Sequence, residues 1–217
     1  MILFRTLLTI IASYVLGAIP SGYLAAKLIK GVDVTQVGSG RIGGSNVLRA
    51  AGVVPAILTV LGDLGKGYGA VALAGLIAPG IPLAPVLAGL SAVGGHNWSV
   101  FLGFDGGVGT ATTFGAALAL LPLPAGVAIA TGALVVLIWR HTSLGSITFA
   151  LVLMLASIVS GAAGATPMDR VLFAVGTSAM ALWELRPNIA RLRQGTERKL
   201  GEYIPAGKKD IQRHRPQ

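Results

Sequence analysis

The residues best suited to chemistry lie close together between positions 38 and 49, in the order GSGRIGGSNVLR. Backbone N–H groups of glycines can wrap an anion, serine hydroxyls add donors, and an arginine side chain can bind two phosphate oxygens at once. If a helix begins near Ser45, then Asn46 and Arg49 project from its first turns, where the helix dipole also favours an anion. The alternative is a flexible surface loop. We predict that this first segment binds phosphate through Gly38, Ser39, Gly40, Arg41, Ser45, Asn46 and Arg49.

The first segment also contains GSGRIG, which matches the G-x-G-x-x-G fingerprint of dinucleotide-binding proteins. That fingerprint is meaningful only after a strand and before a helix inside a βαβ unit. Here it stands between two apolar stretches, so we do not predict a nucleotide site.

A second segment, residues 95–113, reads GHNWSVFLGFDGGVGTATT. His96 is a candidate general base if it reaches a substrate hydroxyl, or else a structural histidine held by a carbonyl group. No other histidine stands three or four residues away and the chain has no cysteine, so no metal site is predicted. The glycines of this segment are Gly95, Gly103, Gly106, Gly107 and Gly109.

A third segment, residues 188–199, follows the last apolar stretch and carries polar side chains at helical spacing. A solvated helix face and a helix that binds lipid headgroups are the alternatives to a functional role. Separately, Asp63 and Lys66 stand three residues apart inside an apolar stretch. Ionisable groups inside a span are costly and usually face a cavity, so a structural pair and a functional pair both remain open. The polar residues of the third segment are Asn188, Arg191, Arg193, Thr196 and Glu197.

The composition indicates the elements that must position these segments. Of 217 residues, 53% are hydrophobic and 12% are charged, against about 25% charged in soluble domains, which excludes a water-soluble single domain. The 31 glycines follow no collagen period and are typical of close helix packing in lipid. We therefore expect an all-α integral membrane protein with about seven transmembrane helices, six or eight being the alternatives because several stretches are shorter than ~20 residues. The apolar stretches are 3–26, which we take as a retained span, 53–78, 83–103, 108–122, 125–139, 144–162 and 170–185.

The net charge of +9 indicates the membrane topology of the chain, because the positions of the Lys and Arg residues follow a pattern. With the N-terminus outside and the C-terminus in the cytoplasm, fourteen of the 17 Lys and Arg lie on the inner side, while only Arg5 and Arg170 lie outside. The three segments then share the cytoplasmic face of the cell membrane. We expect a polytopic membrane domain at 1–186 and a basic cytoplasmic tail at 187–217, which is attracted to anionic lipid headgroups rather than to nucleic acid.

Taken together, the three segments resemble the signature motifs of the bacterial membrane glycerol-3-phosphate acyltransferases that use acyl phosphate as donor. The family pattern GSGNxGxTN followed by VLR stands here as GSGRIGGSNVLR, and GHxxxxFxxFKGGKGVAT stands as GHNWSVFLGFDGGVGTAT. The third pattern, NIxRLxxGTExK, stands as NIARLRQGTERK, and the stretches IPSGYLAAKL and LGDLGKGYGAV also fit. The resemblance covers essentially the whole chain.

The resemblance implies a seven-span enzyme whose cytoplasmic-facing site moves an acyl group from acyl phosphate to the 1-hydroxyl of glycerol 3-phosphate. The products would be lysophosphatidic acid and phosphate, with no cofactor, and a soluble enzyme would supply the acyl phosphate. Ser39, His96 and Arg49 would be catalytic, and either His96 or a substrate phosphate oxygen would take the hydroxyl proton. The substrate-binding set would be Gly38, Gly40, Arg41, Ser45, Asn46, Lys66, Gly106, Gly107, Gly109, Ser143, Asn188, Arg191, Thr196 and Glu197.

Three positions depart from the family patterns. Asp105 and Val108 stand where the second pattern has lysines, and Arg41 stands where the first has asparagine. The lysine changes alter the charge of the second segment by −3 beside a site meant for anions, while Arg41 restores one charge. Three hypotheses follow: an active acyltransferase with rearranged cations, a paralogue with another donor or acceptor, and a non-catalytic binder of lipid phosphates. A transporter would need repeats with polar groups at mid-membrane, and only Asp63 and Lys66 fit that pattern.

Overall fold

The computed structural model describes residues 1–202, in which every named element is a helix. The remaining residues, 203–217, lie outside the described part of the chain, and with them the tail cations Lys208, Lys209, Arg213 and Arg215. The elements are α1 (Ile2–Ala18), α2 (Ser21–Lys30), η1 (Val34–Gln36), α3 (Gly44–Ala51), α4 (Val53–Ile77), α5 (Ala84–Asn97), η2 (Val100–Leu102), α6 (Thr110–Leu120), α7 (Pro122–Trp139), α8 (Thr142–Ala162), α9 (Met168–Glu184) and α10 (Arg186–Arg193).

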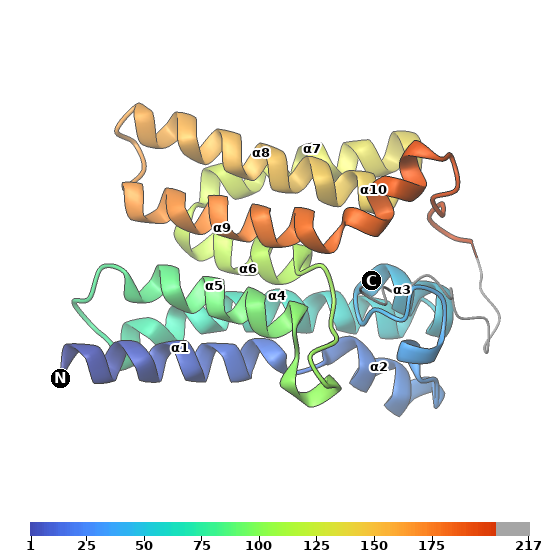
Figure 1. Cartoon of the computed structure of the whole chain (residues 1–217), viewed down its shortest axis with the longest axis horizontal. Coiled ribbons are helices and arrows are strands. Elements are labelled where there is room, and N and C mark those ends of the chain that lie inside the picture. The colour runs from blue at the N-terminus through green and yellow to red at the C-terminus, as the bar shows by residue number, and fades with distance from the viewer. Residues whose placement is uncertain (203–217) are drawn as a thin grey trace, which may run out of the picture.

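The long helices run back and forth between two ends of an elongated bundle (Figure 1). One layer holds α1, α4 and α5, the other holds α7, α8 and α9, and α6 lies between them. The connections at one end hold the three sequence segments together with α2, α3 and α10. Segments far apart in the sequence therefore meet at this end, as the sequence predicted.

The first apolar stretch is two helices rather than the single span expected at 3–26. α1 ends at Ala18 and α2 begins at Ser21, with Ile19 and Pro20 between them. Proline has no N–H group to donate to the preceding turn, so the helix breaks here and leaves carbonyl groups of its last turn without helical partners. The side chain of Lys66 donates to the carbonyl oxygen of Ile19 at 2.9 Å, and Ser99 Oγ donates to that of Ala18 at 2.6 Å. The break thus becomes an attachment point for α4 and the second segment.

Glycines bring the helix backbones into direct contact. A Cβ atom added to Gly17 of α1 would overlap the backbone of Ala92 in α5, and one on Gly67 of α4 would overlap the carbonyl group of Thr112 in α6. Small residues at such positions let helices approach closely in lipid, where van der Waals packing drives association. The glycine surplus is explained in part by these contacts, as the composition suggested.

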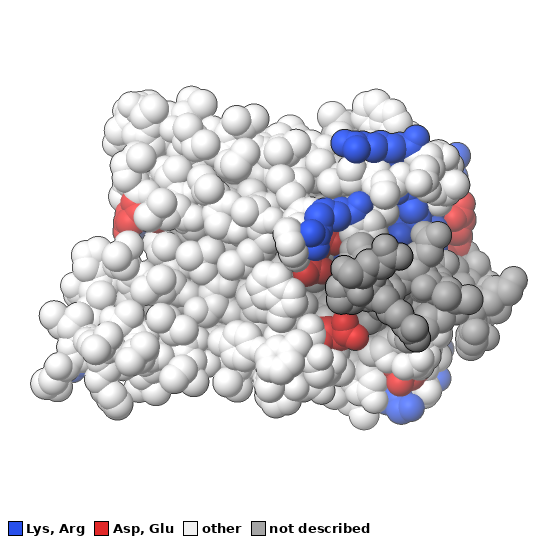
Figure 2. Space-filling model, viewed as in Figure 1, with Lys and Arg blue, Asp and Glu red and all other residues white. Residues whose placement is uncertain are grey.

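The outer surface of the bundle is apolar, whereas most charges gather at one end. Leu76 and Leu137 are 81% and 77% exposed, and many other large apolar side chains are exposed on the long helices. Figure 2 shows a face largely without charged residues, with Lys and Arg collected mainly at the end that holds α10. Such a continuous apolar surface is typical of contact with lipid.

Four helical stretches of the described chain are long and apolar enough to cross a membrane: Ile2–Lys30, which joins α1 and α2, Val53–Ile77, Pro122–Trp139 and Thr142–Ala162. α5, α6 and α9 are shorter, with 14, 11 and 17 residues. The apolar stretch predicted at 83–103 is helical only as far as Asn97, followed by the turn η2.

Candidate active site

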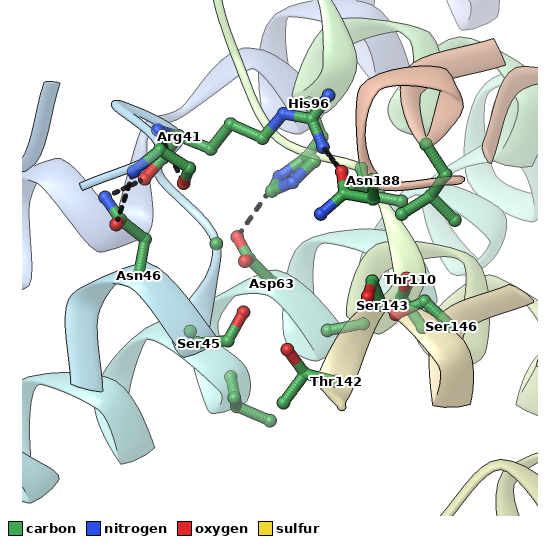
Figure 3. Close-up of a pocket in the computed structure, with 18 of the residues that line it drawn as sticks. Arg41, Ser45, Asn46, Asp63, His96, Thr110, Thr142, Ser143, Ser146 and Asn188 are labelled. Atoms are coloured by element: carbon green, nitrogen blue, oxygen red, sulfur yellow. Dashed lines mark hydrogen bonds and ion pairs between the residues drawn. The ribbon is translucent and has the colours of Figure 1, made fainter. Parts of the chain in front are cut away.

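A pocket of about 440 Å³ opens at the charged end of the bundle (Figure 3). Its wall includes the N-terminal residues of three helices, represented by Ser45 of α3, Thr110 of α6 and Ser143 of α8. A helix N-terminus carries a partial positive charge and unpaired backbone N–H groups, so three of them around one cavity favour an anion. Part of the wall is apolar and includes Val60, Leu64, Phe114 and Ile129. The pocket therefore has a polar part and an apolar part.

Three arginines add positive charge to the pocket wall: Arg41, Arg49 and Arg198. Arg49 is only 8% exposed, and its Nε atom is buried without a hydrogen-bond partner in the described structure. Burial lowers the pKa of the Arg49 guanidinium, and the positive charge of Arg198 lowers it further. A buried guanidinium with a donor left over is what a bound phosphate would satisfy.

The side chain of Asn46 stabilises the loop of the first segment through hydrogen bonds. Its amide nitrogen donates to the carbonyl oxygens of Val34, Val37 and Arg41 at 2.9–3.1 Å, and its Oδ1 accepts from the backbone N–H of Ser39 at 3.2 Å. With 2% exposure and both ends of its amide engaged, Asn46 lies in the pocket wall as a clamp on the loop.

The backbone of the first segment turns at two glycines. Gly38 and Gly40 have backbone φ angles of +57° and +64°, a region that residues other than glycine rarely adopt. Neither glycine lines the pocket, whereas Ser39 between them does. The two glycines therefore shape the turn that presents Ser39.

Arg41 reaches across the pocket from the first segment to the third (Figure 3). Its guanidinium donates to Asn188 Oδ1 at 3.1 Å and to the backbone carbonyl of Glu184, and it lies 3.6 Å from the Glu184 carboxylate. Arg41 thus connects the first segment to the end of α9 and to α10.

A buried cluster of Asp63, Lys66 and His96 lies at the pocket wall, where α4 meets α5. Lys66 Nζ contacts Asp63 Oδ1 and His96 Nδ1, each at 2.9 Å, and His96 Nδ1 lies 3.4 Å from Asp63 Oδ1. His96 Nδ1 therefore faces both the amino group of Lys66 and the carboxylate of Asp63. Asp63 and His96 line the pocket, but Lys66 does not. The structure therefore places Lys66 as a partner of these two residues and not, as we expected, as a direct ligand of the substrate.

Glycines of the second segment lie directly against His96. A Cβ atom on Gly107 would overlap His96 Nε2, and one on Gly106 would overlap the backbone carbonyl of His96. The N–H of Gly107 also donates to that carbonyl at 3.1 Å. Gly109 lines the pocket at the start of α6, with a φ of +82°. Gly106 and Gly107 are thus required by the close packing of the loop on His96, and they do not line the pocket as we expected.

The two departures in the second segment have different positions. Val108 lines the pocket, so an apolar side chain stands where the family pattern has a lysine. Asp105 is exposed, lies outside the pocket wall and forms a backbone bridge with Ser99. The negative charge of Asp105 is therefore not part of the pocket lining.

Ion pairs fold the third segment back over the pocket. Glu197 accepts from Arg191 Nε at 2.7 Å and from Asn188 Nδ2 at 2.8 Å. Asn188 and Glu197 line the pocket, whereas Arg191 and Thr196 do not. Arg191 therefore acts on the pocket through Glu197, and Thr196 only through its bonds to the Arg191 carbonyl.

Hydroxyl groups from α8 complete the polar part of the pocket. Ser143 is 5% exposed and its Oγ has no hydrogen-bond partner in the described structure. Thr142 and Ser146 lie beside it in the pocket wall. Of the predicted residues, the wall brings together Ser39, Arg41, Ser45, Asn46, Arg49, His96, Gly109, Ser143, Asn188 and Glu197.

Sequence reasoning missed other residues of the wall, among them Thr110, Thr142, Ser146 and Arg198. Thr110 and Thr142 open helices that follow a glycine and a cationic turn, and this signal could have marked them as anion donors. Within residues 1–202 no group of three or more His, Asp or Glu side chains is placed to hold a metal ion.

These features define the class of the protein, which is a helical integral membrane protein with a cationic pocket at one end. The chain belongs to the glycerol-3-phosphate acyltransferase family, because the model of that family matches residues 7–195. The "Glycerol-3-phosphate acyltransferase" of Rubrobacter xylanophilus is 44% identical over 195 residues, which cover 89% of this chain and 94% of the relative. That of Shouchella clausii is 40% identical over 195 residues, which cover 89% and 95%.

Two crystal structures of PlsY (YgiH), an integral membrane glycerol 3-phosphate acyltransferase, have the same fold. The glycerol 3-phosphate form matches with a TM-score of 0.83 and 35% identity, covering 90% of this chain and 96% of that one. The lysophosphatidic acid form matches with a TM-score of 0.81 and 34% identity, covering 90% and 95%.

Proposed function

We propose that this protein transfers an acyl group from an acyl phosphate to the 1-hydroxyl of glycerol 3-phosphate, giving lysophosphatidic acid and inorganic phosphate. The observation that carries the proposal is the two-part pocket, whose wall combines three helix N-termini and three arginines with a group of apolar side chains. Both substrates are anionic at one end, and one of them carries a long apolar chain. The similar structures are named for a glycerol 3-phosphate form and a lysophosphatidic acid form, which supports the same pair of substrate and product.

Arg49 and the helix N-termini of α3 and α8 would hold the phosphate groups. The unpartnered Nε of Arg49 and Oγ of Ser143 are the donors available for this role. The acyl chain would lie against Phe114 and Ile129, on the apolar side of the pocket. Because acyl phosphate is already an activated mixed anhydride, catalysis would consist of positioning and of stabilising the carbonyl oxyanion and the departing phosphate.

The 1-hydroxyl oxygen of glycerol 3-phosphate would attack the carbonyl carbon, forming the ester bond. The bond between the acyl carbon and the phosphate oxygen would break, and the phosphate would leave with the electron pair. His96 Nδ1 contacts Lys66 and Asp63, and His96 also lines the pocket. Both His96 and a substrate phosphate oxygen are therefore candidates to accept the hydroxyl proton.

A phosphate-release assay tests the proposal. Purified protein in detergent should release phosphate only when acyl phosphate and glycerol 3-phosphate are both present, and acyl thioesters should not replace the acyl phosphate. The Arg49→Ala variant, checked for normal membrane insertion, serves as the inactive control. Wild-type protein that binds glycerol 3-phosphate but releases no phosphate above background would instead support a non-catalytic binder. Activity with another donor only would support a diverged paralogue.

We also propose that seven helical segments, α1, α4, α5, α6, α7, α8 and α9, cross the membrane, with the pocket facing the cytoplasm. The gathering of cations at the pocket end supports this orientation, because cytoplasmic loops carry the excess of Lys and Arg. In this arrangement acyl phosphate made by a soluble enzyme would reach the pocket directly.

The absence of cysteine makes the orientation simple to test. Lys30→Cys lies at the pocket end and Ala163→Cys at the opposite end, and both positions are exposed. A membrane-impermeant maleimide should label Ala163→Cys in intact spheroplasts and Lys30→Cys only in inverted vesicles. The reverse pattern would show that the proposed orientation is wrong.

A further inference from the structure

Residues 195–202, which we name the strap, cross the connection between α7 and α8 at the mouth of the pocket. The backbone N–H of Leu200 donates to the carbonyl of Arg140, and the Arg140 guanidinium donates to the Leu200 carbonyl at 3.2 Å. His141 Nδ1 lies 3.0 Å from the carbonyl oxygen of Arg198, so the ring N–H donates to it. The strap is therefore held at several points by residues 140 and 141.

The strap delivers two charged side chains to the pocket wall, Glu197 and Arg198. Each carboxylate oxygen of Glu197 already accepts a hydrogen bond, one from Asn188 and one from Arg191. Glu197 is thus held by Asn188 and Arg191, and its negative charge also acts on Arg198 and Arg49. Arg198 brings a positive charge to the same wall.

Arg198 faces a pocket in which another guanidinium is already buried. Arg49 and Arg198 both line this pocket, and the charges of Glu197 and Glu202 act on both guanidinium groups. Two like charges held at one cavity are stabilised by an anion between them. The second segment supplies no cation here, because Val108 occupies its part of the wall.

We propose that Arg198 is a second phosphate-binding residue, which holds a substrate phosphoryl group together with Arg49, and that His141 positions it through the strap. This assignment rests on the proposed use of phosphate-bearing substrates. The phosphoryl group belongs either to glycerol 3-phosphate or to the acyl phosphate, whose leaving group is inorganic phosphate. In this arrangement the strap compensates for the missing cation of the second segment.

Calorimetric titration of the purified full chain tests the proposal with two probes, glycerol 3-phosphate and inorganic phosphate. Arg198→Gln should weaken binding of at least one probe by about 10- to 100-fold, the scale of one charge-assisted hydrogen bond. The probe that is affected identifies the phosphoryl group. Arg193→Gln is the matched control, because Arg193 is exposed on α10 and does not line the pocket, and it should bind both probes as the wild type does.

The positioning role of His141 is tested by a measurement that a purely structural role would leave unchanged. His141→Ala should raise the KM for the substrate that Arg198 binds, with little change in kcat, whereas His141→Asn should restore the KM because its amide keeps a donor for the Arg198 carbonyl. Arg198→Lys should bind the probe with intermediate affinity, since lysine keeps the charge but loses the planar fork.

The outcomes separate this inference from the proposed function. Unchanged binding of both probes by a folded Arg198→Gln variant would overturn the inference, even if the enzyme transfers acyl groups normally. Equal weakening by Arg193→Gln would overturn it as well, because the effect would then be one of net charge. Conversely, Arg198-dependent binding in a protein that releases no phosphate would support the inference while removing the proposed function.

Discussion

Breaking the buried cluster of Asp63, Lys66 and His96 should destabilise the protein strongly. The side chains of Lys66 and Asp63 are only 4% and 3% exposed, and their charged atoms lie 2.9 Å apart. Removing one partner of a buried ion pair costs about 3 to 5 kcal/mol, because the remaining charge is left without compensation in a medium of low polarity. For a chain of this size that loss lowers the unfolding midpoint by about 6 to 20 °C.

The two single variants should lose different amounts of stability. In Asp63→Asn, Lys66 faces His96 Nδ1 at 2.9 Å with no anion nearby, so the loss should lie at the upper end of the range. In Lys66→Met, Asp63 keeps His96 at 3.4 Å as a partner that can take a proton, so the loss should be smaller. The double variant carries no uncompensated charge and should recover much of the loss, with a coupling of about 2 to 3 kcal/mol.

Thermal unfolding in detergent, followed by tryptophan fluorescence, measures these differences. Lys27→Met is the control for the loss of a lysine, because Lys27 is exposed, and its stability should change by less than about 0.5 kcal/mol. The double variant should regain stability without regaining turnover, because His96 has lost the group that fixes its ring. Additive losses in the double variant, or single variants as stable as Lys27→Met, would refute this view of the cluster.

Three further predictions concern the pocket and the bundle. Arg49→Lys should keep weak activity, with kcat/KM lower by about 10-fold or more, since only the guanidinium gives a planar pair of donors. Arg49→Ala should have no activity, and equal rates in both variants would contradict the proposed contact. Val108→Lys should raise kcat/KM for acyl phosphate by about 10- to 100-fold, whereas Asp105→Lys should change it little, and a larger effect of Asp105→Lys would show that the pocket boundary is wrong. In α4, Gly67→Ala should lower the unfolding midpoint because the new Cβ overlaps α6, while Gly75→Ala, which meets open space, should leave it unchanged or raise it slightly; matching midpoints would argue against close helix contact.

Much of the site was predictable because its residues occupy short, contiguous segments. The first segment does begin a helix near Ser45, and Arg49 does project into the pocket from it. Charge counting placed the three segments on one face, and they do lie at one end of the bundle. The seven-helix count and the orientation of the termini remain predictions.

Other assignments changed because the hydrogen-bond partners lie outside the short motif that carries each residue. Asn46 is a residue type that can bind phosphate, but its amide nitrogen donates to the carbonyl oxygens of Val34, Val37 and Arg41 in the adjoining loop. Lys66 was expected at the substrate, yet it contacts Ile19 after α1 and His96 in α5. No motif reveals such partners, since they depend on how the loop folds around Asn46 and on which helices pack against Lys66.

The sequence by itself determined the class of protein, the approximate positions of most long helices and the segments that meet at one end of the bundle. These properties follow from composition, periodicity and short motifs, which act over a few residues. Only the tertiary structure decided that three helix N-termini share one pocket, that Arg198 enters it on a strap, and that Asp105 stays outside while Val108 lines it. The reason is physical: the direction of a side chain at a loop is set by packing between helices that are remote in sequence, and glycine contacts fix that packing.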